Sequence, residues 1–282
     1  MAKEIRTPAL TSKACRVGVC TFISMLVLSL TSYAVEPGML ALDSVENFAA
    51  YANGSLNVSG TTTINGDLGL GPNGTQNFLT TPTVSGTYSK SGLDYVSTTI
   101  TSVSAYAAGL MANQTISYIN NGTTITGNGG YTIVNVGSIS LSGVGGHKLT
   151  LSGGADDIFV LNVSNSVSFL QTSWAPVVLS GGVTADHVLF NLLNASPTAN
   201  ALFVTNGVTL VGTFIAPNAS MLLGSVTLDG GVFAGGNDLA LNGSTINADI
   251  FMLPEPSSFA LVVISCLLGL GLWPRRRHHA SA

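Results

Sequence analysis

Threonines spaced two residues apart form the pattern in this sequence that is best suited to surface chemistry. On a β-strand, residues i and i+2 point to the same face. Rows of hydroxyl and methyl groups on a flat, rigid face can hold ordered water. Weaker versions of the pattern are Ser140 with Ser142 and Thr150 with Ser152. The residues of the candidate binding face are Thr61, Thr63, Thr124 and Thr126.

A purely structural role for these threonines is the alternative. Threonine is a good strand former and suits any exposed face that carries little charge. The sequence shows no regular threonine array that continues through the later part of the chain.

Catalytic chemistry has weaker support. A glycoside hydrolase needs two carboxylates about 5–10 Å apart, whereas Asp156 and Asp157 are adjacent and would point to opposite faces of a strand. We expect this pair to end a turn before a strand at 158–163. His147 and His187 lack the G-x-S-x-G context of a serine nucleophile. The sequence therefore predicts no enzyme, no catalytic residue, no metal site and no cofactor.

Charge is scarce and acidic in residues 35–253. Lys90 and Lys148 are the only basic residues there, against eleven acidic ones, which gives a formal charge of −9. Nucleic-acid binding needs several lysines or arginines to displace counterions from phosphates. The composition therefore excludes nucleic acid as a partner.

The N-terminus has the three parts of a secretory signal. A basic leader precedes the uncharged apolar run 17–30, and Ser32-Tyr33-Ala34 supplies small residues for cleavage after Ala34. The three cysteines, Cys15, Cys20 and Cys266, all lie in the terminal segments, so the body contains no disulfide. We expect residues 1–34 to be a signal peptide.

The C-terminus carries a second targeting pattern. Residues 257–273 are uncharged and mostly apolar, and as a helix they would rise about 26 Å, enough to span a thin bilayer. Arginines beside such a span stay in the cytoplasm, which places the body outside. The residues flanking the apolar run are Pro254, Glu255, Pro256, Arg275, Arg276 and Arg277.

This arrangement resembles a PEP-CTERM sorting signal over 254–282. The resemblance implies that an exosortase in the inner membrane of a Gram-negative bacterium processes the anchored chain near the motif. The product would then reach the cell surface or the extracellular polysaccharide matrix. It implies nothing about what the body binds.

The body, residues 35–253, reads as short strands separated by Gly, Asn, Ser, Thr and Asp turns, many alternating apolar with polar residues. The exception is 91–112, where an apolar residue recurs every three or four positions and predicts one amphipathic helix. The phrase VTL recurs at 208–210 and 226–228, 18 residues apart, about one turn of a β-solenoid. A β-sandwich is the alternative, but its outer faces would more often carry charge.

The body also resembles the ice-binding-like family and related bacterial anchored, adhesin-like domains. Its segment 63–70 (TINGDLGL) is similar to the segment that opens that family, and 153–161 and 206–217 are similar to two of its later coils. The resemblance implies an all-β fold: a right-handed parallel β-helix (solenoid) with one α-helix packed alongside. The resemblance indicates the architecture of the body more strongly than it indicates which ligand the body binds.

The sequence leaves three functions open. The first is a non-catalytic structural or adhesive protein of the surface or matrix that binds polysaccharide through a neutral, hydroxyl-rich face. The second is an ice-binding protein acting through a flat threonine-rich face. The third, a polysaccharide-active enzyme, is disfavoured by the scarcity of charge. Aligned outward threonines on three successive coils would favour the second.

Overall fold

The computed structural model describes residues 39–142, 146–170, 174–194 and 200–252. The signal peptide predicted at 1–34 lies outside these residues, as does the sorting segment predicted at 254–282. Within the described part of the chain, no helix is long and apolar enough to cross a membrane.

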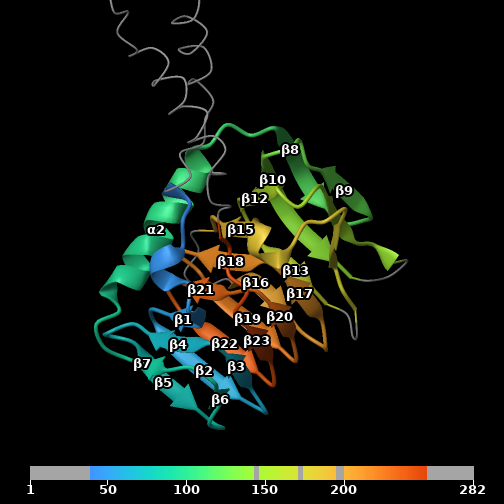
Figure 1. Ribbon diagram of the computed structural model, residues 1–282. Helices are drawn as coiled ribbons and strands as arrows, with labels where there is room; N and C mark the ends of the chain where they lie inside the picture. The colour runs from blue at the N-terminus through green and yellow to red at the C-terminus, as the bar shows by residue number, and fades with distance from the viewer. Residues whose placement is uncertain (1–38, 143–145, 171–173, 195–199, 253–282) are drawn as a thin grey trace, which may run out of the picture. The chain divides into compact units, whose positions relative to one another are not determined.

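Parallel strands wind into coils, and each coil contributes strands to three sides of the body (Figure 1). Every strand pair that the structure describes is parallel, so the prediction of parallel coils is confirmed and the antiparallel sandwich is wrong. The two VTL phrases mark equivalent positions, because Leu210 pairs with Leu228. The right hand of the solenoid stays a prediction.

One side, the helix side, lies under the only α-helix of the described residues. Its strands, in stacking order, are β10 (Tyr131–Leu141), β12 (Ile158–Val163), β15 (Val188–Leu192), β18 (Thr213–Ala216), β21 (Val232–Ala234), β1 (Phe48–Ala52), β4 (Asp67–Leu70) and β7 (Tyr88–Ser89). The edge strand β8 (Gln114–Ile119) pairs with β10.

A second side, the open side, begins at the far end of β10, because this long strand bends from one side to the next. Its remaining strands, in stacking order, are β13 (Val167–Phe169), β16 (Asn200–Val204), β19 (Ser220–Gly224), β22 (Leu239–Asn242), β2 (Ser55–Ser59) and β5 (Thr75–Phe78). It completes the 15-stranded sheet.

The third side consists of two separate sheets. The smaller sheet contains β14 (Val177–Ser180), β11 (Leu149–Ser152) and β9 (Thr123–Thr126). The larger sheet contains β17 (Thr209–Val211), β20 (Thr227–Asp229), β23 (Thr245–Asn247), β3 (Thr63–Asn65) and β6 (Thr83–Val84).

The coils do not stack in the order of the sequence. The last coil pairs with the first, because β21, β22 and β23 pair with β1, β2 and β3. The chain starts in the middle of the stack, builds two coils towards one end, and crosses to the other end through the helix. It then winds back until it meets its own first coil (Figure 1).

The helix α2 (Asp94–Gly109) confirms the helix predicted at 91–112, with ends a few residues shorter. Val96, Ile100, Val103 and Ala107 are buried as the periodicity predicted. They pack on β12, β15 and β18. The predicted apolar face thus faces the sheet.

Buried asparagines attach α2 to the sheet. Asn191 Nδ2 donates to the Ser104 carbonyl at 3.0 Å, and Asn191 Oδ1 lies 2.6 Å from Ser104 Oγ. Asn162 Nδ2 donates to the Ala107 carbonyl at 2.8 Å. Asn191 Nδ2 also donates to Asn162 Oδ1 at 2.8 Å, so the two asparagines form one ladder. These bonds satisfy polar atoms that would otherwise be buried at a cost.

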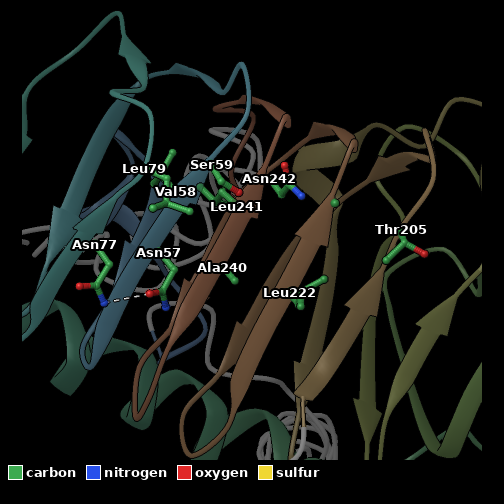
Figure 2. Close-up of a pocket in the computed structure, with 11 residues that line it drawn as sticks. Asn57, Val58, Ser59, Asn77, Leu79, Thr205, Leu222, Ala240, Leu241 and Asn242 are labelled. Atoms are coloured by element: carbon green, nitrogen blue, oxygen red, sulfur yellow. Dashed lines mark hydrogen bonds between the residues drawn. The ribbon is translucent and has the colours of Figure 1, made fainter.

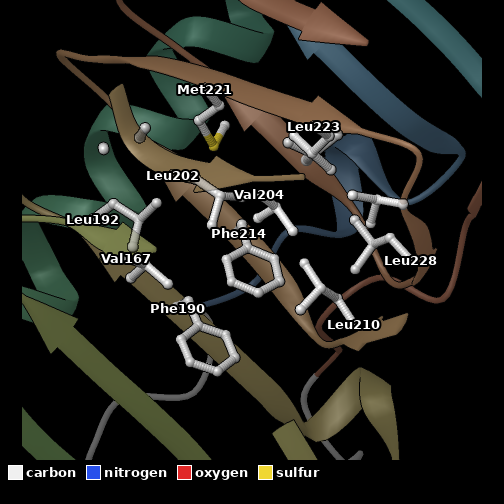
Figure 3. Packing of buried hydrophobic residues seen from close by; sticks show 14 of the residues in the cluster. Val167, Phe190, Leu192, Leu202, Val204, Leu210, Phe214, Met221, Leu223 and Leu228 are labelled. Carbon is white, nitrogen blue, oxygen red and sulfur yellow. The ribbon is translucent and has the colours of Figure 1, made fainter. Parts of the chain in front are cut away.

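Inward side chains of the three sides form one continuous core (Figure 3). Paired strands place like residues above one another, and the rings of Phe190 and Phe214 stack with centroids 4.5 Å apart and planes 5° from parallel. In-register stacking therefore builds the core layer by layer.

Replacing Asn191 by alanine should lower the free energy of unfolding by about 2 kcal/mol, because Ser104 and the helix carbonyl would lose buried partners. Urea unfolding followed by circular dichroism measures the change. Asn77→Ala is the control, since Asn77 makes one exposed bond to Asn57, and it should cost below about 0.5 kcal/mol. Equal losses in the two variants would mean that the asparagine ladder does not hold the helix.

Candidate functional site

A ladder of threonines runs along the larger sheet of the third side. Each of five neighbouring strands places one threonine at the same register, and each threonine is paired with the next. The flanking strand positions alternate between buried and accessible, so these side chains point away from the core. The members of this threonine ladder, in spatial order, are Thr209, Thr227, Thr245, Thr63 and Thr83.

The backbone holds each threonine against the coil before it. Thr227 N donates to the Val208 carbonyl at 2.9 Å, and Thr245 N donates to the Val226 carbonyl at 2.7 Å. Thr63 N likewise donates to the Ser244 carbonyl, and Thr83 N to the Thr62 carbonyl, each at 2.9 Å. The spacing along the ladder is therefore the parallel-strand spacing of about 4.8 Å.

A second row of side chains fixes the border of the ladder. Asp229, Asn247 and Asn65 stand two residues after three of the ladder positions, Thr227, Thr245 and Thr63. Asn247 Nδ2 donates to Asp229 Oδ1 at 2.6 Å, and Asn65 Nδ2 donates to Asn247 Oδ1 at 2.7 Å. Because each amide is tied to its neighbour, this border has few rotamers available.

The core supports the ladder from beneath. Between the two outward rows lies an inward row that includes Leu210, Leu228, Ile246 and Ile64, all buried. Ser244, also fully buried, accepts from Val226 N and donates to the Leu223 carbonyl at the corner before the ladder strand. Packed aliphatic residues below and hydrogen-bonded corners beside it keep the surface regular.

Glycines allow the coils to turn sharply after the ladder strands. Gly212 and Gly230 have φ of 98° and 146°, where other residues are strained. A Cβ on Gly230 would also collide with the Gly212 carbonyl oxygen. Glycines at these corners therefore lie directly above one another, and this close approach lets neighbouring ladder strands stay in register.

The four threonines predicted from the sequence lie in three places. Thr63 belongs to the threonine ladder. Thr61 is exposed in the bend before β3, outside the strand. Thr124 and Thr126 are exposed on β9 in the smaller sheet. There they lie beside Thr150 and Ser152, so those two predicted pairs form a patch of their own.

Sequence reasoning missed four of the five ladder residues: Thr209, Thr227, Thr245 and Thr83. Two of them stand in the repeated VTL phrase, which indicated coil length but was not connected to a surface. The others precede Ile246, which is buried, and Val84, which is partly buried, so the shared signal is a threonine immediately before an inward aliphatic residue. It becomes visible only when the strands are aligned.

The tryptophan and the two histidines of the body, all within the described residues, show no arrangement that suggests catalysis. Trp174, the only tryptophan of the body, is partly buried against the core. His187 lies in the short 3-10 helix η5 (Ala185–His187), and His147 lies in the loop before β11. Among the described residues, no group of three or more His, Asp or Glu side chains is arranged to hold a metal ion. The predicted sorting residues and Ala34 lie outside the described residues.

The Asp157 carboxylate accepts hydrogen bonds from backbone N–H groups at a corner of the solenoid. Its Oδ1 accepts from Gly129 N at 2.7 Å and Gly130 N at 3.1 Å, and its Oδ2 accepts from Gly154 N at 2.7 Å. Burial opposes ionisation, but these bonds and one from Asn128 N outweigh burial and hold the pKa of Asp157 below its usual value. The carboxylate thus joins the turn before β12 to the neighbouring coil.

Comparisons with known proteins agree on the fold. Residues 27–247 match the model of a family described as an ice-binding-like adhesive domain. A comparison with curated protein sequences finds no match.

Solved structures of ice-binding proteins superpose on most of the chain. One from an Antarctic biological consortium is 25% identical, with a TM-score of 0.61 over 78% of this chain and 93% of its own. One from an Arctic yeast is 20% identical, with a TM-score of 0.59 over 77% and 98%. One from the Antarctic ascomycete Antarctomyces psychrotrophicus is 20% identical, with a TM-score of 0.56 over 73% and 96%. The last two show the fold alone.

Asp157→Asn should destabilise the protein by about 2 kcal/mol at neutral pH, because three backbone donors would lose a charged acceptor. The folded-state pKa of Asp157 is lowered, so its stabilisation is present above the unfolded-state pKa of about 3.9 and is lost as the pH falls through the folded-state value. The gap between parent and variant should therefore close below about pH 4. Urea unfolding between pH 2.5 and 7 tests this.

The adjacent Asp156→Asn is the matched control, because Asp156 is exposed in the turn. It should leave the unfolding midpoint nearly unchanged. A gap between parent and Asp157→Asn that stays constant down to pH 2.5 would contradict the role of the ionised carboxylate.

Proposed function

We propose that this chain, which belongs to the ice-binding-like adhesive domain family, binds ice through the threonine ladder. One observation carries the proposal: five outward threonines stand in register on neighbouring coils. The four steps between them extend about 19 Å at the usual strand spacing. The fold shared with solved ice-binding proteins supports the same reading.

Threonine suits this task because each side chain offers one hydroxyl and one methyl group. The hydroxyls hydrogen-bond water while the methyls limit where that water can sit. Repetition at a constant spacing turns single bound waters into an ordered layer. Such a layer can merge with the surface of a growing ice crystal.

Rigidity makes the binding favourable. A β-branched residue on a strand has few χ1 rotamers, so little side-chain entropy is lost when water is ordered around it. The backbone bonds between coils and the bonded border of Asp229, Asn247 and Asn65 keep the row in place. The ladder is preorganised, and preorganisation lowers the cost of binding.

We also propose that the chain is exported and sorted to the cell surface or the extracellular matrix. The support is the sequence of its ends, with a basic leader and an apolar run before Val35 and a Pro254-Glu255-Pro256 segment ahead of an apolar run and three arginines. An exosortase would be the processing partner and the inner membrane a transient anchor. In that setting the body acts as a non-catalytic binding domain of the surface, where ice is one ligand.

Thr227→Tyr should abolish most ice binding, because one large ring breaks the even row at its second position. We expect the purified variant to inhibit ice recrystallisation only at about tenfold higher concentration than the parent, which is equivalent to 1.4 kcal/mol. Crystal shaping in a nanolitre osmometer gives a second readout. Circular dichroism should show an unchanged fold, since Thr227 is exposed.

Thr124→Tyr is the matched control, because Thr124 is exposed on a strand of the smaller sheet. It should retain the parent activity. If Thr124→Tyr loses activity and Thr227→Tyr keeps it, ice binds the smaller sheet and the ladder proposal is wrong. If the parent itself is inactive at micromolar concentration, ice binding is refuted.

Replacing Pro254, Glu255 and Pro256 together by alanine should trap the protein in the inner membrane. The parent, expressed in a Gram-negative host that has an exosortase, should appear at the surface or in the matrix with Val35 as its first residue. Cell fractionation, immunoblotting and N-terminal sequencing measure both. Identical fractionation of parent and variant would rule out sorting through this motif.

A further inference from the structure

A groove of about 420 Å³ lies on the open side of the body, away from the threonine ladder. It crosses β5, β2, β22 and β19 and reaches Thr205 at the end of β16 (Figure 2). These strands are hydrogen-bonded neighbours, so the groove runs across them, along the direction in which the coils stack. Over five strands it extends about 19 Å.

Two rows of outward side chains form its walls (Figure 2). One row is Asn77, Asn57, Ala240 and Leu222, on four consecutive coils. The other row lies two residues further along the strands and is Leu79, Ser59, Asn242, Gly224 and Thr205.

Two small residues hollow the surface between these walls. Gly224 has no side chain at its place in the second row, and Ala240 is short at its place in the first. Each is next to a larger group, Asn242 beside Gly224 and Leu222 beside Ala240. The groove is therefore a property of particular residues and does not follow from the sheet alone.

The lining combines apolar surface with uncharged polar groups. Not one of its residues is charged, although the body carries a formal charge of −9. Leu79 is 86% exposed and Leu222 is half-buried, so two aliphatic side chains meet the solvent at opposite ends. Exposed apolar surface within a groove is typical of a binding site.

Asparagine amides supply hydrogen bonds of both kinds. Asn77 Nδ2 donates to Asn57 Oδ1 at 2.9 Å. This bond uses one of the two amide protons of Asn77 and one of the two lone pairs of Asn57. Asn242 adds a third amide across the groove. Amides that both donate and accept complement hydroxyl groups, which do the same.

We propose that this groove binds a linear, neutral polysaccharide laid along the stacking direction of the coils. A sugar ring has apolar C–H faces and a rim of hydroxyls, which match the leucines and the amides. A neutral chain requires no ion pair, and the groove offers none. The repeat of the coils spaces these groups about 4.8 Å apart along the groove, so an extended chain can contact several coils in succession. The site is distinct from the threonine ladder and does not depend on ice binding.

Other occupants fit less well. An acidic polysaccharide would meet a body with a net negative charge and no cation in the groove. A second copy of this chain would leave the amides of Asn57, Asn77 and Asn242 partly desolvated. These alternatives become outcomes of the test.

The decisive variant is Gly224→Phe, which fills the groove. The backbone accepts a side chain there, because a Cβ on Gly224 would lie 3.6 Å from its nearest neighbours and φ is not positive. Leu79→Ser is the second variant, and because Leu79 is exposed, we expect the substitution to leave the fold unchanged. Thr227→Tyr serves as the matched control, because it adds an aromatic ring to the other binding side.

The purified chain is sedimented with insoluble cellulose, with insoluble β-1,3-glucan and with calcium alginate beads as the acidic control. We expect retention on at least one neutral polymer, weakened about tenfold by Gly224→Phe and severalfold by Leu79→Ser. Thr227→Tyr should bind the polymer like the parent, and Gly224→Phe should keep the parent activity on ice.

Three results would overturn the proposal. The first is no retention on either neutral polymer, and the second is equal retention of parent and Gly224→Phe. The third is self-association, seen by light scattering, that Gly224→Phe removes, since it would assign the groove to a second copy. Loss of ice activity in Thr227→Tyr alone would leave the groove intact, so failures of the two proposed sites are distinguishable.

Discussion

The structure depends on one constraint: each strand must lie in register beneath the equivalent strand of the next coil. Parallel backbone bonds set this register, as in the donation from Thr245 N to the Val226 carbonyl. Once register is fixed, inward residues such as Phe190 and Phe214 stack into a core and outward residues form rows. Core, corners and binding surfaces are therefore consequences of the same repeat. A shift of one residue would exchange the buried and outward rows.

The three sides differ in what lies on their outward rows. On the helix side, Asn162 and Asn191 point outward and bind the backbone of α2, so that side is covered. On the third side, threonines and a bonded amide border give an even surface suited to ordered water. On the open side, Gly224 and Ala240 leave a hollow with amides on its walls. Similar strands thus carry three different surfaces through their outward residues alone: one attaches the helix, one is the proposed ice-binding row and one is the proposed polymer groove.

The absence of cysteine from the body and the scarcity of charge leave stability to packing and hydrogen bonding. Buried asparagines, the Asp157 carboxylate and Ser244 each join one coil to another at a position where a backbone group would lack a partner.

The sequence by itself determined the local features: short alternating strands, a helix near 91–112, the coil length seen in VTL, and the hydroxyl-rich, charge-poor character of the surface. These follow from side-chain period and composition, which act over a few residues. Only the tertiary structure decided that the last coil meets the first and that Thr63 therefore lies beside Thr245. Residues 182 positions apart become neighbours because the chain crosses the stack through α2 and winds back to its first coil, which no local pattern encodes. The ladder spans that junction, so the sequence supplied its threonines and the fold assembled them.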